Sequence, residues 1–101
     1  MELLDECRIA VRVASRSLDP ELEMLIADAK RDMERVGVRP ELLGDDGLDA
    51  MAKSAVVCFV KSHFGLDASP DERAFFEQSY RSHVAALLNS DANSASGGGA
   101  A

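Results

Sequence analysis

The side chains best suited to bind a metal or act as nucleophiles are Cys7, Cys58, His63 and His83. They stand far apart in the chain and show none of the strong spacings of zinc sites. Cys58 lies in the apolar run AVVCFV, where desolvation disfavours the reactive thiolate. The sequence therefore predicts no metal, no cofactor and no catalysis on Cys58. A site assembled from distant parts of the fold stays the alternative.

Carboxylates are abundant, but their pattern does not suit acid–base catalysis. Each falls at an expected helix start or on a polar helix face, and none lies in an apolar run that would raise its pKa. The run DDGLD differs from a calcium loop in its spacing and in the missing twelfth-position ligand. Ser69 and Glu72 match a capping box around Pro70, so the carboxylates that follow His63 mark a helix start.

Charged residues of opposite sign form stripes on the first two predicted helices. Arg8, Arg12 and Arg16 recur every four residues, and acidic residues follow on the next helix. One interpretation is a pair of solvated faces with weak ion pairs. The other is that the basic edge of one subunit meets the acidic edge of the next in a ring. With Lys61 and His63 near a helix corner, the candidate subunit-contact residues are Arg8, Arg12, Arg16, Glu21, Asp28, Asp32, Lys61 and His63.

The elements that position these residues are predicted to be helices, in an all-α bundle of one domain. The chain is 47% hydrophobic without Trp, so its core is built from the aliphatic residues of packed helices. Apolar residues recur at three- and four-residue spacings in four segments. The predicted helices span about residues 3–14, 20–36, 47–64 and 70–88.

Cap and turn residues bound these helices. Asp19 is the expected N-cap of the second helix, with Pro20 at its first position. Asp45 or Asp46 is the expected cap of the third helix. The glycines expected to end the second and third helices are Gly37 and Gly65.

The third predicted helix is apolar on nearly all sides, which indicates that it is the central element. A turn at Leu42 and Leu43 is expected to fold back over the core. The predicted core residues are Leu25, Ile26, Ala29, Met33, Ala55, Val56, Phe59, Val60, Phe76 and Tyr80.

The last residues differ in composition from the rest of the chain. Residues 1–88 are predicted to form the helical domain, and residues 89–101, rich in Ser, Gly and Ala, are predicted to be a disordered tail. The formal net charge of −7 disfavours a nucleic-acid reader or a binder of anionic membranes. Without an apolar run of about 18 residues or a signal peptide, the chain is expected to stay in the cytoplasm where it is made.

The order of four segments resembles a known family. The segments are LLDECRIAVRV, DPELEMLIADAKRDMERVGV, MAKSAVVCFVKSHFG and DERAFFEQSYRSHVAALL. They resemble the head-tail connector (adaptor) family of tailed phages and prophages, also labelled phage DNA-packaging proteins, over nearly all of residues 3–88. The most specific pieces are LI.DAK.DM...GV, within residues 25–38, and the VKSHFG...DERAFFEQSY junction, residues 60–80.

The resemblance implies a non-enzymatic structural subunit in a ring of about a dozen copies at the head-tail junction of the virion. Such a ring docks on the portal protein, meets a downstream connector or tail component, and extends the channel for DNA. DNA would pass without sequence-specific binding, and an acidic subunit suits that role because it repels phosphates. Before assembly the subunit would reside in the host bacterial cytoplasm.

A second function class fits the same sequence. A small cytoplasmic helical adaptor or regulator would bind one protein partner through an exposed groove. A helix-turn-helix DNA binder is disfavoured, because no helix pairs a tight glycine turn with a basic recognition face.

Overall fold

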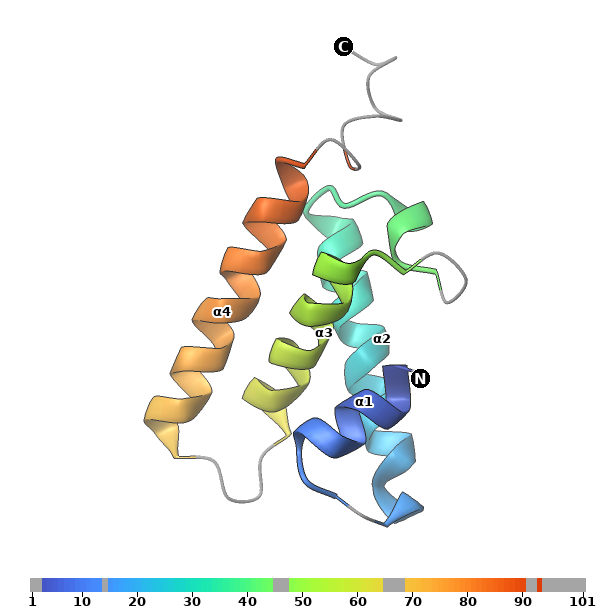
Figure 1. The fold of residues 1–101 in the computed structure, drawn as a ribbon, viewed down its shortest axis with the longest axis vertical. Coiled ribbons are helices and arrows are strands. Elements are labelled where there is room, and N and C mark those ends of the chain that lie inside the picture. The colour runs from blue at the N-terminus through green and yellow to red at the C-terminus, as the bar shows by residue number, and fades with distance from the viewer. Residues whose placement is uncertain (1–2, 14, 45–47, 65–68, 91–92, 94–101) are drawn as a thin grey trace.

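The computed structural model describes residues 3–13, 15–44, 48–64, 69–90 and 93, and in these residues the fold is all-α, as predicted (Figure 1). Two short 3₁₀ turns, η1 at Arg16–Leu18 and η2 at Pro40–Leu42, lie between the helices. The α-helices are α1 (Leu3–Ala10), α2 (Asp19–Arg35), α3 (Ala50–His63) and α4 (Pro70–Leu88).

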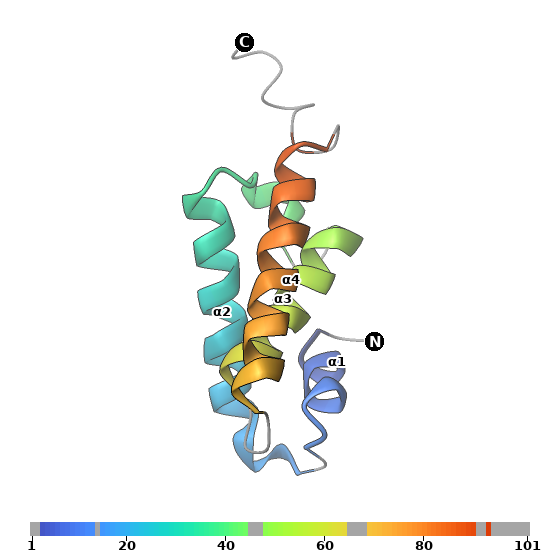
Figure 2. The ribbon, with the colours of Figure 1, turned by 90° about the vertical axis from the view of Figure 1, so that its left-hand side faces the viewer.

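The central element is α3, as its apolar surface predicts. It lies between α2 and α4 and runs antiparallel to both, and its most extensive contacts are with α4 (Figure 1). The short α1 packs against α2 and α3. Figure 2 shows α4 in front of α3, with α2 and α1 to its two sides. Because α3 separates them, α2 and α4 are left as the two walls of a groove.

The prediction that the first helix runs to residue 14 is wrong, because α1 ends at Ala10. Arg12 takes a left-handed conformation with φ 60°. The Val13 amide donates to the Arg8 carbonyl and the Arg12 amide to the Ile9 carbonyl, both at 3.0 Å, which is a Schellman ending. Because an arginine stands where glycine is usual, the sequence does not predict this helix end. Beyond it, Val13 packs on the core.

The second helix agrees with its prediction to within one residue. Gly37 ends it at φ 117°, with the Val38 amide bonded to the Met33 carbonyl at 2.9 Å, so this predicted stop is confirmed. The predicted cap is wrong, because Leu18 occupies the N-cap position and Asp19 is the first helical residue. The Asp19 carboxylate binds Arg8 instead of the free amides of its own helix.

The third helix begins three residues later than predicted, at Ala50. Asp49 is its cap and accepts hydrogen bonds from the amides of Met51 at 2.8 Å and Ala52 at 3.2 Å. The predicted caps Asp45 and Asp46 lie outside the described residues, as does the predicted stop Gly65.

The fourth helix has the predicted bounds and the predicted capping box. The Glu72 amide donates to Ser69 Oγ at 3.1 Å, and the Ser69 amide donates to the Glu72 carboxylate at 3.2 Å. Beyond α4, Asn93 accepts a hydrogen bond from the Arg39 amide at 2.8 Å and donates to the Gly37 carbonyl at 3.3 Å. Of the predicted tail, the described residues are Asn89, Ser90 and Asn93.

Most of the predicted core is confirmed as buried. Leu25, Phe59 and Phe76 differ, because they are only half-buried. Phe59 forms part of the groove described below, and Phe76 lies under the ammonium group of Lys61. The predicted core residues that are buried are Ile26, Ala29, Met33, Ala55, Val56, Val60 and Tyr80, and the remaining buried apolar residues are Cys7, Leu22, Val38, Leu43, Ala52, Phe64, Val84 and Leu87.

Candidate functional site

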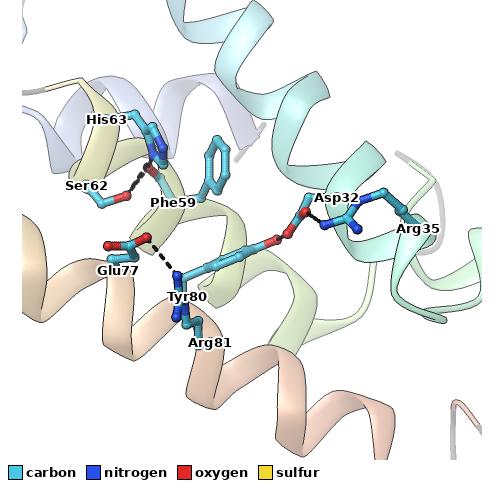
Figure 3. A network of polar contacts seen from close by, with 8 residues as sticks. All are labelled: Asp32, Arg35, Phe59, Ser62, His63, Glu77, Tyr80 and Arg81. Carbon is cyan, nitrogen blue, oxygen red and sulfur yellow. Dashed lines mark hydrogen bonds and ion pairs between the residues drawn. The ribbon is translucent and has the colours of Figure 1, made fainter.

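A groove of about 650 Å³ runs between α2 and α4, with α3 beneath it. Its walls carry charged side chains, and its interior carries aromatic and aliphatic ones, several of which Figure 3 shows. The lining residues are Asp28, Asp32, Arg35 and Val36 of the α2 side, Phe59, Ser62 and His63 of α3, and Glu77, Tyr80, Arg81, Val84, Ala85 and Leu88 of α4.

A polar network spans the groove from α4 to α2 (Figure 3). The Tyr80 hydroxyl donates to the Asp32 carboxylate at 2.7 Å, and Arg35 donates to the other carboxylate oxygen at 2.6 Å. These two donors hold the pKa of Asp32 below its usual range. Burial, and then the adjacent Asp32, raise the pKa of Tyr80. The network therefore keeps an ionised carboxylate and a neutral phenol side by side.

Aromatic rings form the middle of the groove. The rings of Phe59 and His63 stack with centroids 4.2 Å apart, and Tyr80 meets Phe59 edge-on at 5.1 Å. His63 Nδ1 lies 3.0 Å from the Phe59 carbonyl oxygen and 2.8 Å from Ser62 Oγ (Figure 3). The two contacts fix the orientation of the imidazole at the end of the groove formed by the C-terminus of α3.

The charges along the rim are paired within the chain. Arg81 meets Glu77 at 3.1 Å on α4, and Arg31 meets Asp28 at 3.0 Å on α2. These pairs are exposed, so water screens them and each contributes little to stability. They are also free to exchange partners when another charged surface approaches.

The predicted basic stripe is absent, because α1 ends before two of its three arginines. Arg12 and Arg16 are exposed beyond α1, and Arg16 lies in η1. Arg8 is only 9% exposed and donates to Asp19 at 3.0 Å and to Asp5 at 2.7 Å. Its guanidinium therefore pairs within the chain, and the bond to Asp19 joins α1 to the start of α2.

The contacts of Arg8 with Asp19 and Asp5 also shift pKa values. The hydrogen bonds to Asp19 and Asp5 raise the pKa of Arg8, and Arg8 holds the pKa of Asp19 below its usual range. A second ion pair, Lys53 to Glu6 at 2.9 Å, joins α3 to α1. Both pairs make α1 a fixed part of the domain.

The other predicted contact residues are distributed over different faces. Asp28, Asp32 and His63 come together in the groove, and Glu21 is exposed on α2 outside it. Lys61 is two residues from His63 but does not line the groove. Each helical residue is rotated by about 100°, so residues two apart in the sequence point to nearly opposite sides of α3. Its ammonium group lies 4.3 Å from the centroid of Phe76.

Sequence reasoning did not identify the α4 wall of the groove. The sequence places Tyr80 in the core, where it is buried, but gives no sign that it also lines a groove with Glu77 and Arg81. A signal is present in hindsight, since Glu77, Tyr80, Val84 and Leu88 recur at three- and four-residue spacings and share one face of α4. The sequence does not reveal that α2 lies opposite this face.

The cysteines are unsuited to nucleophilic chemistry. Cys7 is fully buried, and burial, with Glu6 nearby, raises its pKa to about 11. Burial also raises the pKa of the half-buried Cys58. Neither thiol is activated toward the thiolate that a catalytic cysteine needs.

The described residues contain neither a metal-binding cluster nor a membrane-spanning helix. No group of three or more His, Cys, Asp or Glu side chains in that part of the chain is placed to hold a metal ion. No helix there has the length and apolarity needed to cross a bilayer.

The groove has the chemistry of a docking surface, with an aromatic and aliphatic interior between exposed rims that carry both signs of charge. Such a surface binds an apolar side chain and orients it by its charged neighbours. Comparisons with protein families, with curated proteins and with solved structures gave no match for this chain.

Proposed function

We propose that this chain is a structural, non-enzymatic subunit of a phage or prophage head-tail connector ring. In this role it docks on the portal protein and extends the DNA channel toward the tail. The ring belongs to the head-tail junction of the virion, and the free subunit to the host bacterial cytoplasm. The proposal starts from the resemblance of residues 3–88 to that family.

The observation that carries the proposal is that the two most specific segments of the resemblance meet at the groove. Asp28 and Asp32 come from the first segment, and His63, Glu77 and Tyr80 come from the second. If only core residues resembled the family, a similar helix packing would be enough to explain the resemblance. Side chains that meet at an exposed groove instead suit a shared binding surface.

The charge of the chain supports the same role. A net charge of −7 gives the subunit a potential that repels DNA phosphates. A channel wall should let DNA slide, and the tight phosphate contacts of DNA-binding proteins would oppose sliding. An acidic subunit therefore suits a conduit.

The test is to mix the purified chain with the portal protein encoded in the same genome. We expect a ring of the chain on the portal, visible by negative-stain microscopy and by the mass of the intact complex. A chain that neither forms rings nor binds the portal would contradict the proposal. A control mixture with an unrelated ring-shaped protein should show no binding.

The groove is also the observation that favours the second candidate, a small adaptor that binds one protein partner. Gene context separates the two candidates. Portal, terminase and capsid genes beside this one favour the connector, and a location away from phage genes favours the adaptor.

A further inference from the structure

Phe75 is among the large apolar side chains that are exposed in the described part of the chain. Its side chain, at the start of α4, is 64% exposed and meets the Phe76 ring edge-on, with centroids 5.4 Å apart. The Lys61 ammonium group lies over the Phe76 ring at 4.3 Å. We call Lys61, Phe75 and Phe76 the aromatic knob. Apolar surface left in water is unfavourable, so a partner surface gains by covering this ring.

The knob and the groove point to different neighbours. A helix turns by about 100° per residue, so Glu77, two residues after Phe75, lies on the opposite side of α4. Val84 and Leu88, which also line the groove, lie within about 40° of the direction opposite Phe75. One subunit can therefore present Phe75 to a partner on one side while its groove receives a partner on the other.

The groove complements the knob in chemistry. Its interior offers the half-buried ring of Phe59 and the half-buried side chain of Leu88 to an incoming phenylalanine. On its rim, the carboxylates of Asp28 and Glu77 pair with Arg31 and Arg81 at exposed positions, where an incoming ammonium group can replace the arginine. Aromatic pairs gain more than their buried area alone predicts, and opposite charges orient the approach.

We infer that the aromatic knob of one copy inserts into the groove of the next copy of this chain. This inference rests on the proposed function and names the subunit contact within the proposed ring. The two surfaces differ, so the contact is head-to-tail and generates a closed ring, or an open filament if the rotation does not close. Lys61 is the basic residue of the knob that would face the carboxylates on the groove rim.

The experiment uses full-length variants that each lose one surface. Phe75→Ala removes the knob, and Ala85→Trp fills the groove from an exposed position in its lining. We expect each variant alone to associate at least roughly tenfold more weakly than the natural chain, because a central aromatic anchor is lost or blocked. Association is measured by sedimentation and by mass spectrometry of intact complexes.

Mixing the two variants gives the decisive measurement. The intact groove of Phe75→Ala should accept the intact knob of Ala85→Trp, so a 1:1 mixture should form heterodimers and nothing larger. A self-complementary contact would not produce this result. If Ala85→Trp does not fold, as judged by circular dichroism, Ala85→Arg fills the same position with a longer polar side chain.

Two matched variants control for nonspecific effects. Ile9 is 63% exposed on α1, so Ile9→Ala removes a similar apolar area outside the knob. Ala27 is exposed on α2 and does not line the groove, so Ala27→Trp adds the same bulk elsewhere. Both should associate as the natural chain does.

Three outcomes would overturn the inference: a natural chain that stays monomeric at about 1 mM, variants that associate normally, or a mixture without heterodimers. The proposed function fails separately. If Phe75→Ala still forms rings on the portal, the inference is wrong and the connector stands. If heterodimers form but the natural chain ignores the portal, the contact stands and the connector role falls.

Discussion

The hydroxyl of Tyr80 donates a 2.7 Å hydrogen bond to the carboxylate of Asp32, joining α4 to α2 across the groove that both helices border. The two residues are 48 positions apart in the chain. Arg35 holds the same carboxylate from the α2 side, so Asp32 keeps a partner if Tyr80 is changed. The contact fixes the spacing of the groove walls.

Replacing Tyr80 with phenylalanine should lower the free energy of unfolding by about 1–2 kcal/mol. The change removes a partly buried hydrogen bond to a charged group and keeps the packing of the ring. Urea denaturation measures the difference, with Ser82→Ala, at an exposed position on α4, as the control. Equal stability of Tyr80→Phe and Ser82→Ala would show that the bond does not stabilise the domain.

Stability should fall at both ends of the pH range. The pKa of Asp32 is lower in the folded chain, so its contribution is complete above the ordinary value of about 4 and is lost as pH falls further. The pKa of Tyr80 is higher in the folded chain, so its contribution is complete below about 10 and is lost as pH rises further.

Thermal unfolding across pH tests both limbs. Asp32→Asn should flatten the acidic limb, and Asp19, whose pKa is also lowered, should account for part of what remains. Tyr80→Phe should flatten the alkaline limb in part, because Cys7, with its pKa raised to about 11, acts in the same direction. An unchanged acidic limb in Asp32→Asn would disprove the assignment to Asp32.

Replacing Arg8 with alanine should lower the melting temperature clearly, because it leaves Asp19 and Asp5 without their shared partner at the α1–α2 junction. Arg31→Ala is the matched control, since Arg31 pairs with Asp28 on the exposed face of α2. That change should alter stability by no more than about 0.5 kcal/mol. Similar effects of the two variants would mean that the Arg8 pair is no stronger than a surface pair.

Alkylation should distinguish the two cysteines. At pH 8, iodoacetamide should modify the half-buried Cys58 well before Cys7, which is fully buried and has a pKa of about 11. Cys7 should react only after the α1 region opens, so urea should accelerate its modification more than that of Cys58. Peptide mass spectrometry measures both rates, and faster labelling of Cys7 in native buffer would contradict its buried position.

Local sequence signals predicted the elements that depend on neighbouring residues. The start of α4 follows from the Ser69–Glu72 capping box, and the end of α2 follows from Gly37. The same logic failed where a cap had no distinctive residue. Arg12 takes the left-handed position usually held by glycine, so the apolar periodicity that continues past Ala10 gave too long a first helix.

The sequence by itself determined four helices, a central α3 and most of the core, because helix periodicity and caps are interactions between residues three or four positions apart. Tertiary structure alone decided which charges are buried and which are exposed. Arg8 reaches Asp19 within its own chain, and Tyr80 reaches Asp32 across 48 positions. Such pairs depend on how the helices pack, and one-dimensional spacing contains no record of that packing.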